Sequence, residues 1–508
     1  MSATEKRVDG VPPPTAEGLS VRFARALGVH DAGRALRHFT AYLPTQLVPA
    51  LAGFIVLPVL ARRLTPTELG VLAIAQTLIT LGWTAAGSWI AISIVRLLPR
   101  HRQVATTGAF SRTLTHALGL GAVVMAAFSG VLAAAGIFSD AIGDNLLLIV
   151  AAAAGLVLQN LAVSILRASL RPRAYAVVDV LARTGGVGLG VLLVFADYGV
   201  QGYLAGLASA SLLVGSLALA TSWPRAGLPA EEHDAELGVW LRYGVPASLS
   251  AVATWALAFV DRYLLALLEN TGAVGVYSVG NVIGDKAVAI PAMAFLVGSG
   301  PLLITAYERS GRGEVERLMR AYTRFILLIG AGAAALVTTV ATILVPLLVG
   351  GRDAYLPAAD VVPFVALGAL LYALALVGYT GLVVARRTWP MVHAAVIGVG
   401  VNVVANLLLI PRLGIVGAAI ATPIGTGTFL LACQVWSRRY ATWRFPWATL
   451  LRAAAAGTAG FGVAREAIAY AGGAAAQLGI ALVVFSLVYL VVLALVGERR
   501  VGAADASS

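Results

Sequence analysis

A few charged and amide side chains stand well inside long apolar stretches of this sequence, and they are its candidates for binding chemistry. Lys286, one of only two lysines in the chain, directly follows Asp285 and stands one helical turn beyond Asn281. An ionised side chain at the centre of a membrane-spanning helix costs about 2.5–3.5 kcal/mol on insertion scales, so it usually faces a partner or a wet cavity. Lys286 therefore either binds an anion or pairs with an acid on a neighbouring helix. Asp285 likewise is either a cavity residue or one half of an ion pair with a neighbouring helix.

Two further acid–base pairs have the same character. Asp179 and Arg183 stand at positions i and i+4 with the acid first, which favours an intrahelical ion pair. A role for Arg183 as a cavity cation is the alternative. Asp261 and Arg262 are adjacent near the outer end of a later apolar stretch, and we expect them to snorkel to the membrane interface. Contact with a ligand is their alternative role.

The remaining polar candidates are an arginine and an amide pair. Arg96 ends an apolar stretch, where it either marks the cytoplasmic border or attracts an anionic head group. Asn402 and Asn406 share one helix face, which favours hydrogen bonding between helices, and Asn402 is kept as a candidate cavity residue. Because Cys433 is the single cysteine and no cluster has metal-ligand spacing, the sequence predicts no disulfide, metal centre or cofactor.

The elements that must position these residues are helices that cross a membrane. Hydrophobic residues make up 59% of the 508-residue chain and charged residues only 12%, whereas soluble domains contain about a quarter charged residues. Apolar runs of about twenty residues, each able to cross the ~30 Å hydrocarbon core, recur along the whole length. The sequence predicts an all-α polytopic membrane protein with about 14 spans. We place them near residues 41–61, 70–95, 113–137, 145–166, 174–196, 201–222, 244–267, 275–305, 324–349, 361–384, 390–410, 414–436, 450–470 and 474–496.

Basic residues between these spans predict the orientation of the chain. With the N-terminus inside, the inner joins hold roughly 28 basic residues and the outer joins roughly six, so both termini are expected in the cytoplasm, with the protein in the plasma (inner) membrane. The net charge of +12 is thereby explained without a nucleic-acid partner. We expect a basic N-terminal segment (1–40), a first six-helix bundle (41–222), a linker (223–242), a second six-helix bundle (243–436), a loop (437–449), an appended helix pair (450–496) and a tail (497–508).

An internal repeat relates the two bundles. LLVFADYGVQGYLAGLASA from Leu192 resembles LLLIPRLGIVGAAIATPIG from Leu407, and LTPTELGVLAIAQTLI from Leu64 resembles ENTGAVGVYSVGNVI from Glu269. The second match places Gly70 against Gly275. A parallel repeat about an axis along the membrane normal is typical of transporters, whose substrate site lies between the halves. Duplication that kept the fold without transport is the alternative.

Three stretches resemble the polysaccharide-exporting branch of the multidrug/oligosaccharidyl-lipid/polysaccharide flippase superfamily. They are PVLARRLTPTELGVLAIAQTLITL from Pro58, YGVPASLSAVATWALAFVDRYLLALLENTGAVGVYSVGNVIGDKAV from Tyr243, and VNVVANLLLIPRLGIVGAAIAT from Val401. The resemblance implies a flippase, not an enzyme, that carries a polyprenyl-linked oligosaccharide to the outer leaflet by alternating access. A fixed cation such as Lys286 would offset the desolvation of the pyrophosphate that links glycan to lipid.

The resemblance also defines the alternatives and the partners. Flippases of lipid-linked peptidoglycan precursors have a similar helix number, and a multidrug exporter driven by sodium or protons belongs to the same superfamily. A membrane glycan polymerase or ligase would need a larger outer loop than any predicted here. The expected partners are the lipid-linked glycan, membrane lipid and glycan assembly proteins, with the chain itself a monomer.

Overall fold

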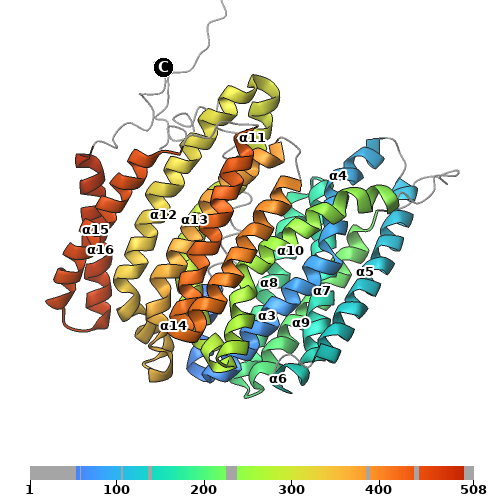
Figure 1. Ribbon diagram of the computed structural model, residues 1–508. Helices are drawn as coiled ribbons and strands as arrows, with labels where there is room; N and C mark the ends of the chain where they lie inside the picture. The colour runs from blue at the N-terminus through green and yellow to red at the C-terminus, as the bar shows by residue number, and fades with distance from the viewer. Residues whose placement is uncertain are drawn as a thin grey trace, which may run out of the picture.

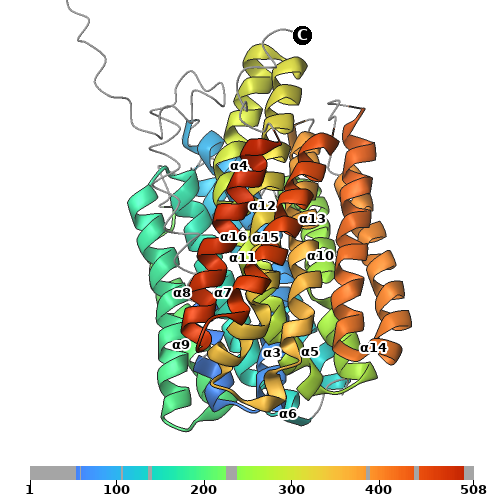
Figure 2. The same ribbon diagram turned by 90° about the vertical axis from the view of Figure 1, so that its left-hand side faces the viewer.

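The structure, a computed structural model, describes residues 53–57, 59–103, 107–135, 140–224, 237–384, 389–439 and 445–496. Within these ranges the regular elements are helices, which run up and down through one bundle (Figures 1 and 2). Ten helices of the described part are long and apolar enough to cross a membrane. The predicted all-α polytopic membrane fold is confirmed. The predicted segments 1–40 and 497–508, and parts of the predicted first span, linker and loop, lie outside the described residues.

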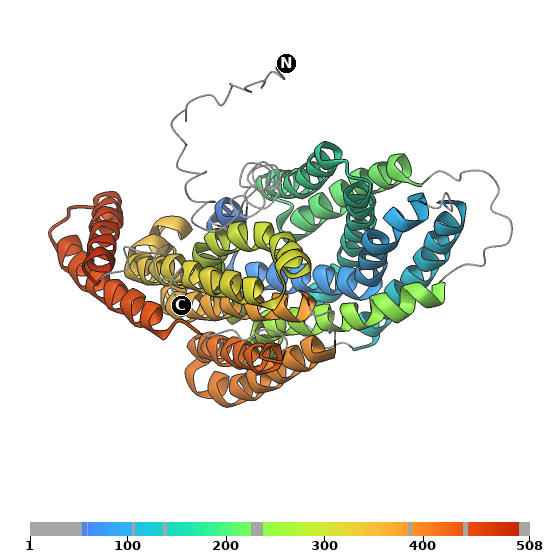
Figure 3. The same cartoon turned by 90° about the horizontal axis from the view of Figure 1, so that it is seen from above.

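The helices form two halves and an appended pair. Seen along the bundle, the blue-to-teal helices lie on one side, the yellow-to-orange helices on the other, and the appended pair at the far edge beside α12 (Figure 3). The first half contains residues 53–57 and 59–63, α3 (Pro66–Ala86), α4 (Ser88–Gln103), α5 (Thr107–Ala135), α6 (Asp140–Gly143), α7 (Leu146–Ala168), α8 (Pro172–Phe195) and α9 (Gly199–Ser222). The second half contains α10 (Leu237–Leu268), α11 (Thr271–Ser310), α12 (Arg312–Val349), η1 (Asp353–Tyr355), α13 (Ala358–Val384) and α14 (Trp389–Ser437), and the pair is α15 (Trp447–Ala469) and α16 (Ala474–Leu495).

Two predicted boundaries are corrected. The span expected at 70–95 is two helices, α3 and α4, with a bend at Gly87, where the side chain of Trp83 packs over the backbone. The expected start of the ninth span at residue 324 is wrong, because α12 already begins at Arg312, after a break at Gly311, whose φ is 75°. Ion pairs within the first turns of α12, such as that from Arg312 to Glu316, allow this polar stretch to be helical.

The backbone supports the repeat that the sequence predicts. Gly199 and Gly414, which the repeat aligns, both adopt the left-handed conformation, with φ of 53° and 55°, where α9 begins and where α14 folds back on itself. This conformation favours glycine, because it crowds the β-carbon of other residues. α14 therefore corresponds to the two spans predicted at 390–410 and 414–436.

The two halves meet where α3 and α11 begin. A β-carbon added at Gly70 would overlap the carbonyl oxygen of Thr271, and one added at Gly275 would overlap that of Pro66. Since Gly70 aligns with Gly275, the same interval aligns Pro66 with Thr271, so each contact repeats the other. Only helices without a side chain at these positions approach this closely.

Candidate functional site

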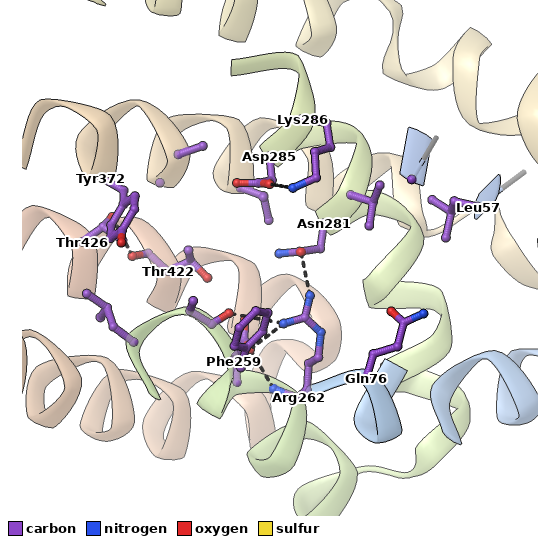
Figure 4. Close-up of a pocket in the computed structure, with 18 of the residues that line it drawn as sticks. Leu57, Gln76, Phe259, Arg262, Asn281, Asp285, Lys286, Tyr372, Thr422 and Thr426 are labelled. Carbon is purple, nitrogen blue, oxygen red and sulfur yellow. Dashed lines mark hydrogen bonds and ion pairs between the residues drawn. The ribbon is translucent and has the colours of Figure 1, made fainter. Parts of the chain in front are cut away.

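A cavity of about 420 Å³ lies between the two halves (Figure 4). Its wall comes from residues 53–57, Leu60, α3 and α9 of the first half, and from α10, α11, α13 and α14 of the second half. The lining residues are Gly53, Val56, Leu57, Leu60, Gln76, Tyr203, Leu257, Ala258, Phe259, Asp261, Arg262, Asn281, Val282, Asp285, Lys286, Val365, Gly368, Ala369, Tyr372, Thr422 and Thr426. Transporters built from parallel repeats bind substrate in this location.

Arg262 of α10 is held in the wall by several hydrogen bonds. Its guanidinium donates to Asn281 Oδ1 of α11 at 2.8 Å and to the carbonyl of Ala258 at 3.3 Å. The neighbouring carboxylate of Asp261 lies 3.8 Å from the guanidinium and accepts a hydrogen bond from the Tyr277 hydroxyl. Both side chains of the pair are more than 90% buried. This network joins α10 to α11 and neutralises Arg262.

Lys286 and Asp285 form a second ion pair, one turn further along α11. Lys286 Nζ lies 2.7 Å from Asp285 Oδ2, and the two side chains are 35% and 37% exposed. In Figure 4 the ammonium and the carboxylate point toward one another beside the amide of Asn281. Among the charged cavity residues, this pair is therefore the accessible one.

One expectation about these pairs is wrong, and one alternative for Lys286 and Asp285 is not what the structure shows. Asp261 and Arg262 do not snorkel to the interface, because Tyr277 and Asn281 supply hydrogen bonds that keep them buried. Lys286 and Asp285 do not pair with charges on neighbouring helices in the described structure. Although adjacent residues leave a helix about 100° apart, the flexible lysine side chain reaches back to the carboxylate before it.

The other candidates lie outside the cavity lining. Arg183 pairs with Asp179 at 2.9 Å within α8, as the i,i+4 spacing predicts, and Arg183 is 44% exposed. Arg96 is exposed and packs over the ring of Tyr243, with 3.9 Å from its guanidinium carbon to the ring centre. Asn402 donates to the carbonyl of Ala421 at 3.0 Å and so joins the two arms of α14, the packing role that its position favours.

Several polar and aromatic cavity residues were not among the candidates that the sequence offered. Gln76, Tyr203, Phe259, Tyr372 and Thr422 all line the cavity. The repeat could have identified Gln76, because the interval of 205 from Gly70 to Gly275 also aligns Gln76 with Asn281. For the aromatic residues no signal of this kind was available, since tyrosine and phenylalanine are common in helix packing.

The same interval shows that the charge of the cavity is asymmetric. Asp261 and Arg262 align with Val56 and Leu57, which line the opposite wall. The charged lining residues of the described structure all belong to the second half, while the first half contributes the apolar wall formed by Gly53, Val56, Leu57 and Leu60. One wall can therefore hold a polar or anionic group and the other an apolar chain.

This fold defines a polytopic membrane protein with a cavity between its two halves. The sequence model of a family described as polysaccharide biosynthesis proteins matches residues 35–298, just over half of the chain. The chain therefore belongs to this family. An uncharacterized membrane protein of Methanocaldococcus jannaschii is 25% identical over 185 residues, and the chain spans 36% of the length of that relative.

Solved structures share the fold over most of the chain. The lipid II flippase MurJ in an inward closed conformation has a TM-score of 0.72 at 13% identity, and the match covers 89% of this chain and 97% of that one. A multidrug resistance MATE transporter in an inward-facing conformation has a TM-score of 0.63 at 15% identity, covering 78% of this chain and 97% of that one. These likenesses confirm the predicted fold.

Proposed function

We propose that this protein moves a glycan, linked to a polyprenyl lipid through pyrophosphate, from the inner to the outer leaflet. The observation that carries the proposal is the accessible cation Lys286 in the central cavity of a polysaccharide biosynthesis protein. Lys286 binds the pyrophosphate, because an ammonium offsets the cost of taking phosphate charge out of water. Arg262 and Asn281 hold the polar wall beside it in place.

The two unlike walls of the cavity support an amphipathic substrate. Val56, Leu57 and Leu60 suit the first isoprenoid units of a carrier lipid, while Asn281 and Gln76 offer amides to sugar hydroxyls. Phe259 and Tyr372 add flat apolar faces on which sugar rings can pack. The charged head group and its lipid thus each meet a surface of matching polarity.

The contact between the halves supports alternating access. Gln76 and Asn281 follow Gly70 and Gly275 by six residues, about 9 Å along each helix, so the crossing of α3 and α11 closes one end of the cavity. By the predicted orientation this end faces outward. The described arrangement then corresponds to a state closed toward the outside, from which separation of α3 and α11 would release the substrate.

Deletion of the gene tests the function. Lipid-linked glycan should accumulate on the inner leaflet, and the corresponding surface glycan should disappear and return with a plasmid copy. The alternative, a sodium- or proton-coupled multidrug exporter, is favoured by the fold shared with the MATE transporter but not by the cavity, whose two acids are each paired with a base. Lost drug resistance with intact surface glycan would support the exporter and overturn the flippase.

A further inference from the structure

The two ion pairs of the cavity differ in how firmly they are held. Arg262 has hydrogen bonds to Asn281 and to a main-chain carbonyl in addition to its contact with Asp261, and the pair is buried. Among the described residues, Lys286 bonds only to Asp285, and about a third of each side chain is exposed. Lys286 can therefore exchange its partner at low cost, whereas Arg262 cannot.

The fold itself does not require the Lys286–Asp285 pair. The interval of 205 residues that aligns Gly70 with Gly275 aligns Lys286 with Leu81 and Asp285 with Thr80. α3 thus builds the equivalent helix of the first half with neither charge. Because the pair lines the cavity and is only partly buried, its charges are available for binding.

We propose that Asp285 is an exchangeable counter-ion for Lys286. A phosphate group of the substrate displaces the Asp285 carboxylate from Lys286 on binding, and the ion pair between Asp285 and Lys286 forms again on release. The inference rests on the proposed function. An ammonium that is about two-thirds buried is favoured by a carboxylate beside it, so Asp285 stabilises the substrate-free protein while the protein changes between its conformational states. The same carboxylate competes with the phosphate and thereby keeps binding weak enough for release.

Asp285→Asn in the full chain, purified into lipid nanodiscs, tests the inference with inorganic pyrophosphate as the probe. Calorimetric titration should give a Kd about fivefold lower than that of the wild type, equivalent to about 1 kcal/mol. The reason is that asparagine has the shape of aspartate but lacks the negative charge that competes with pyrophosphate. Glycan transport per molecule should fall, since release and the return of the substrate-free protein both slow. Asp285→Glu, which keeps the charge, should stay near the wild type in both measurements.

The matched control is Asp179→Asn, which removes the acid of an intrahelical ion pair outside the cavity and should leave the Kd unchanged. Asp285→Ala provides a second removal of the carboxylate and should also tighten binding. Unchanged or weaker binding in Asp285→Asn and Asp285→Ala, with binding abolished in Lys286→Ala, would overturn the counter-ion while leaving the flippase proposal intact. Pyrophosphate binding that persists in Lys286→Ala would instead overturn Lys286 as the ligand, and the counter-ion with it.

Discussion

Arg62 and Arg352, one from each half of the bundle, each donate hydrogen bonds to the main chain beside the other. Arg62 donates to the carbonyls of Leu347 and Leu348 at 3.0 Å each. Arg352 donates to the carbonyls of Ala61 and Leu64 at 2.9 Å and 2.6 Å. The carbonyls of Leu347 and Leu348 lie in the last turn of α12, where carbonyls lack helical partners, so Arg62 satisfies them. The reciprocal contact lies at the end of the bundle where α3 begins.

Arg352→Ala should weaken the closure of the cavity by α3 and α11. It removes two charge-assisted hydrogen bonds, each worth about 1.5–3 kcal/mol when well sheltered and less where water competes. A cysteine at position 76, in a chain lacking Cys433, should then react several times faster with a membrane-impermeant maleimide added outside. The control is Arg412→Ala, an exposed arginine at the same end of the bundle. Equal labelling rates in the two variants would contradict a closing role for Arg352.

A covalent link across the α3–α11 crossing should stop transport. A β-carbon at position 272 lies 3.5 Å from Oγ1 of Thr67, close enough for a disulfide between Thr67→Cys and Gly272→Cys. Oxidation should trap the closed state and abolish glycan transport, and reduction should restore it. The single-cysteine variants serve as controls. Full transport by the cross-linked protein would show that this end does not open during the cycle.

Lys286→Ala should abolish transport while the protein remains inserted and abundant. The pair with Asp285 is about one-third exposed, and such ion pairs contribute only about 0–1 kcal/mol to stability. Lys286→Arg should restore part of the activity, because the charge remains although the guanidinium differs in shape from the ammonium. Surface glycan per molecule of inserted protein is the measurement. Unchanged output per molecule in Lys286→Ala would eliminate the ligand role.

Arg262→Ala should behave differently, because it leaves the buried carboxylate of Asp261 without its counter-charge. Breaking a buried pair in this way typically costs about 3–5 kcal/mol, so we expect lower abundance and a lower midpoint of thermal unfolding. Arg317→Ala, which opens a pair whose side chains are 48% and 28% exposed, is the control and should lower the midpoint only slightly. Similar losses of stability in both variants would contradict the difference in burial.

The orientation is tested by cysteine labelling from outside. Both termini and the segments around Arg102, Arg171, Arg317, Arg387 and Arg439 are predicted to face the cytoplasm. In a chain lacking Cys433, a cysteine at position 317 in intact cells should not react with an impermeant reagent, and permeabilised cells should give full reaction. Labelling of position 317 in intact cells would reverse the orientation.

The sequence by itself determined the class of the protein and its repeat. Apolar runs long enough to cross a bilayer predict helices, because a chain in lipid must satisfy its backbone hydrogen bonds internally. Gly199 and Gly414 marked the same turn in both halves, since the left-handed backbone there excludes most side chains. The pair of Asp179 with Arg183 was also predictable, because its geometry depends on one helix alone.

The tertiary structure alone decided which charges belong to the cavity. The sequence predicted that Asp261 and Arg262 lie at the membrane interface. In the structure, Tyr277 and Asn281 of α11 bind them, and these partners are sixteen and nineteen residues away along the chain. Gln76, Tyr203 and Tyr372 became lining residues only because helices of both halves converge. Periodicity gives the length of a membrane helix but not its rotation, which depends on packing against neighbours distant in the sequence.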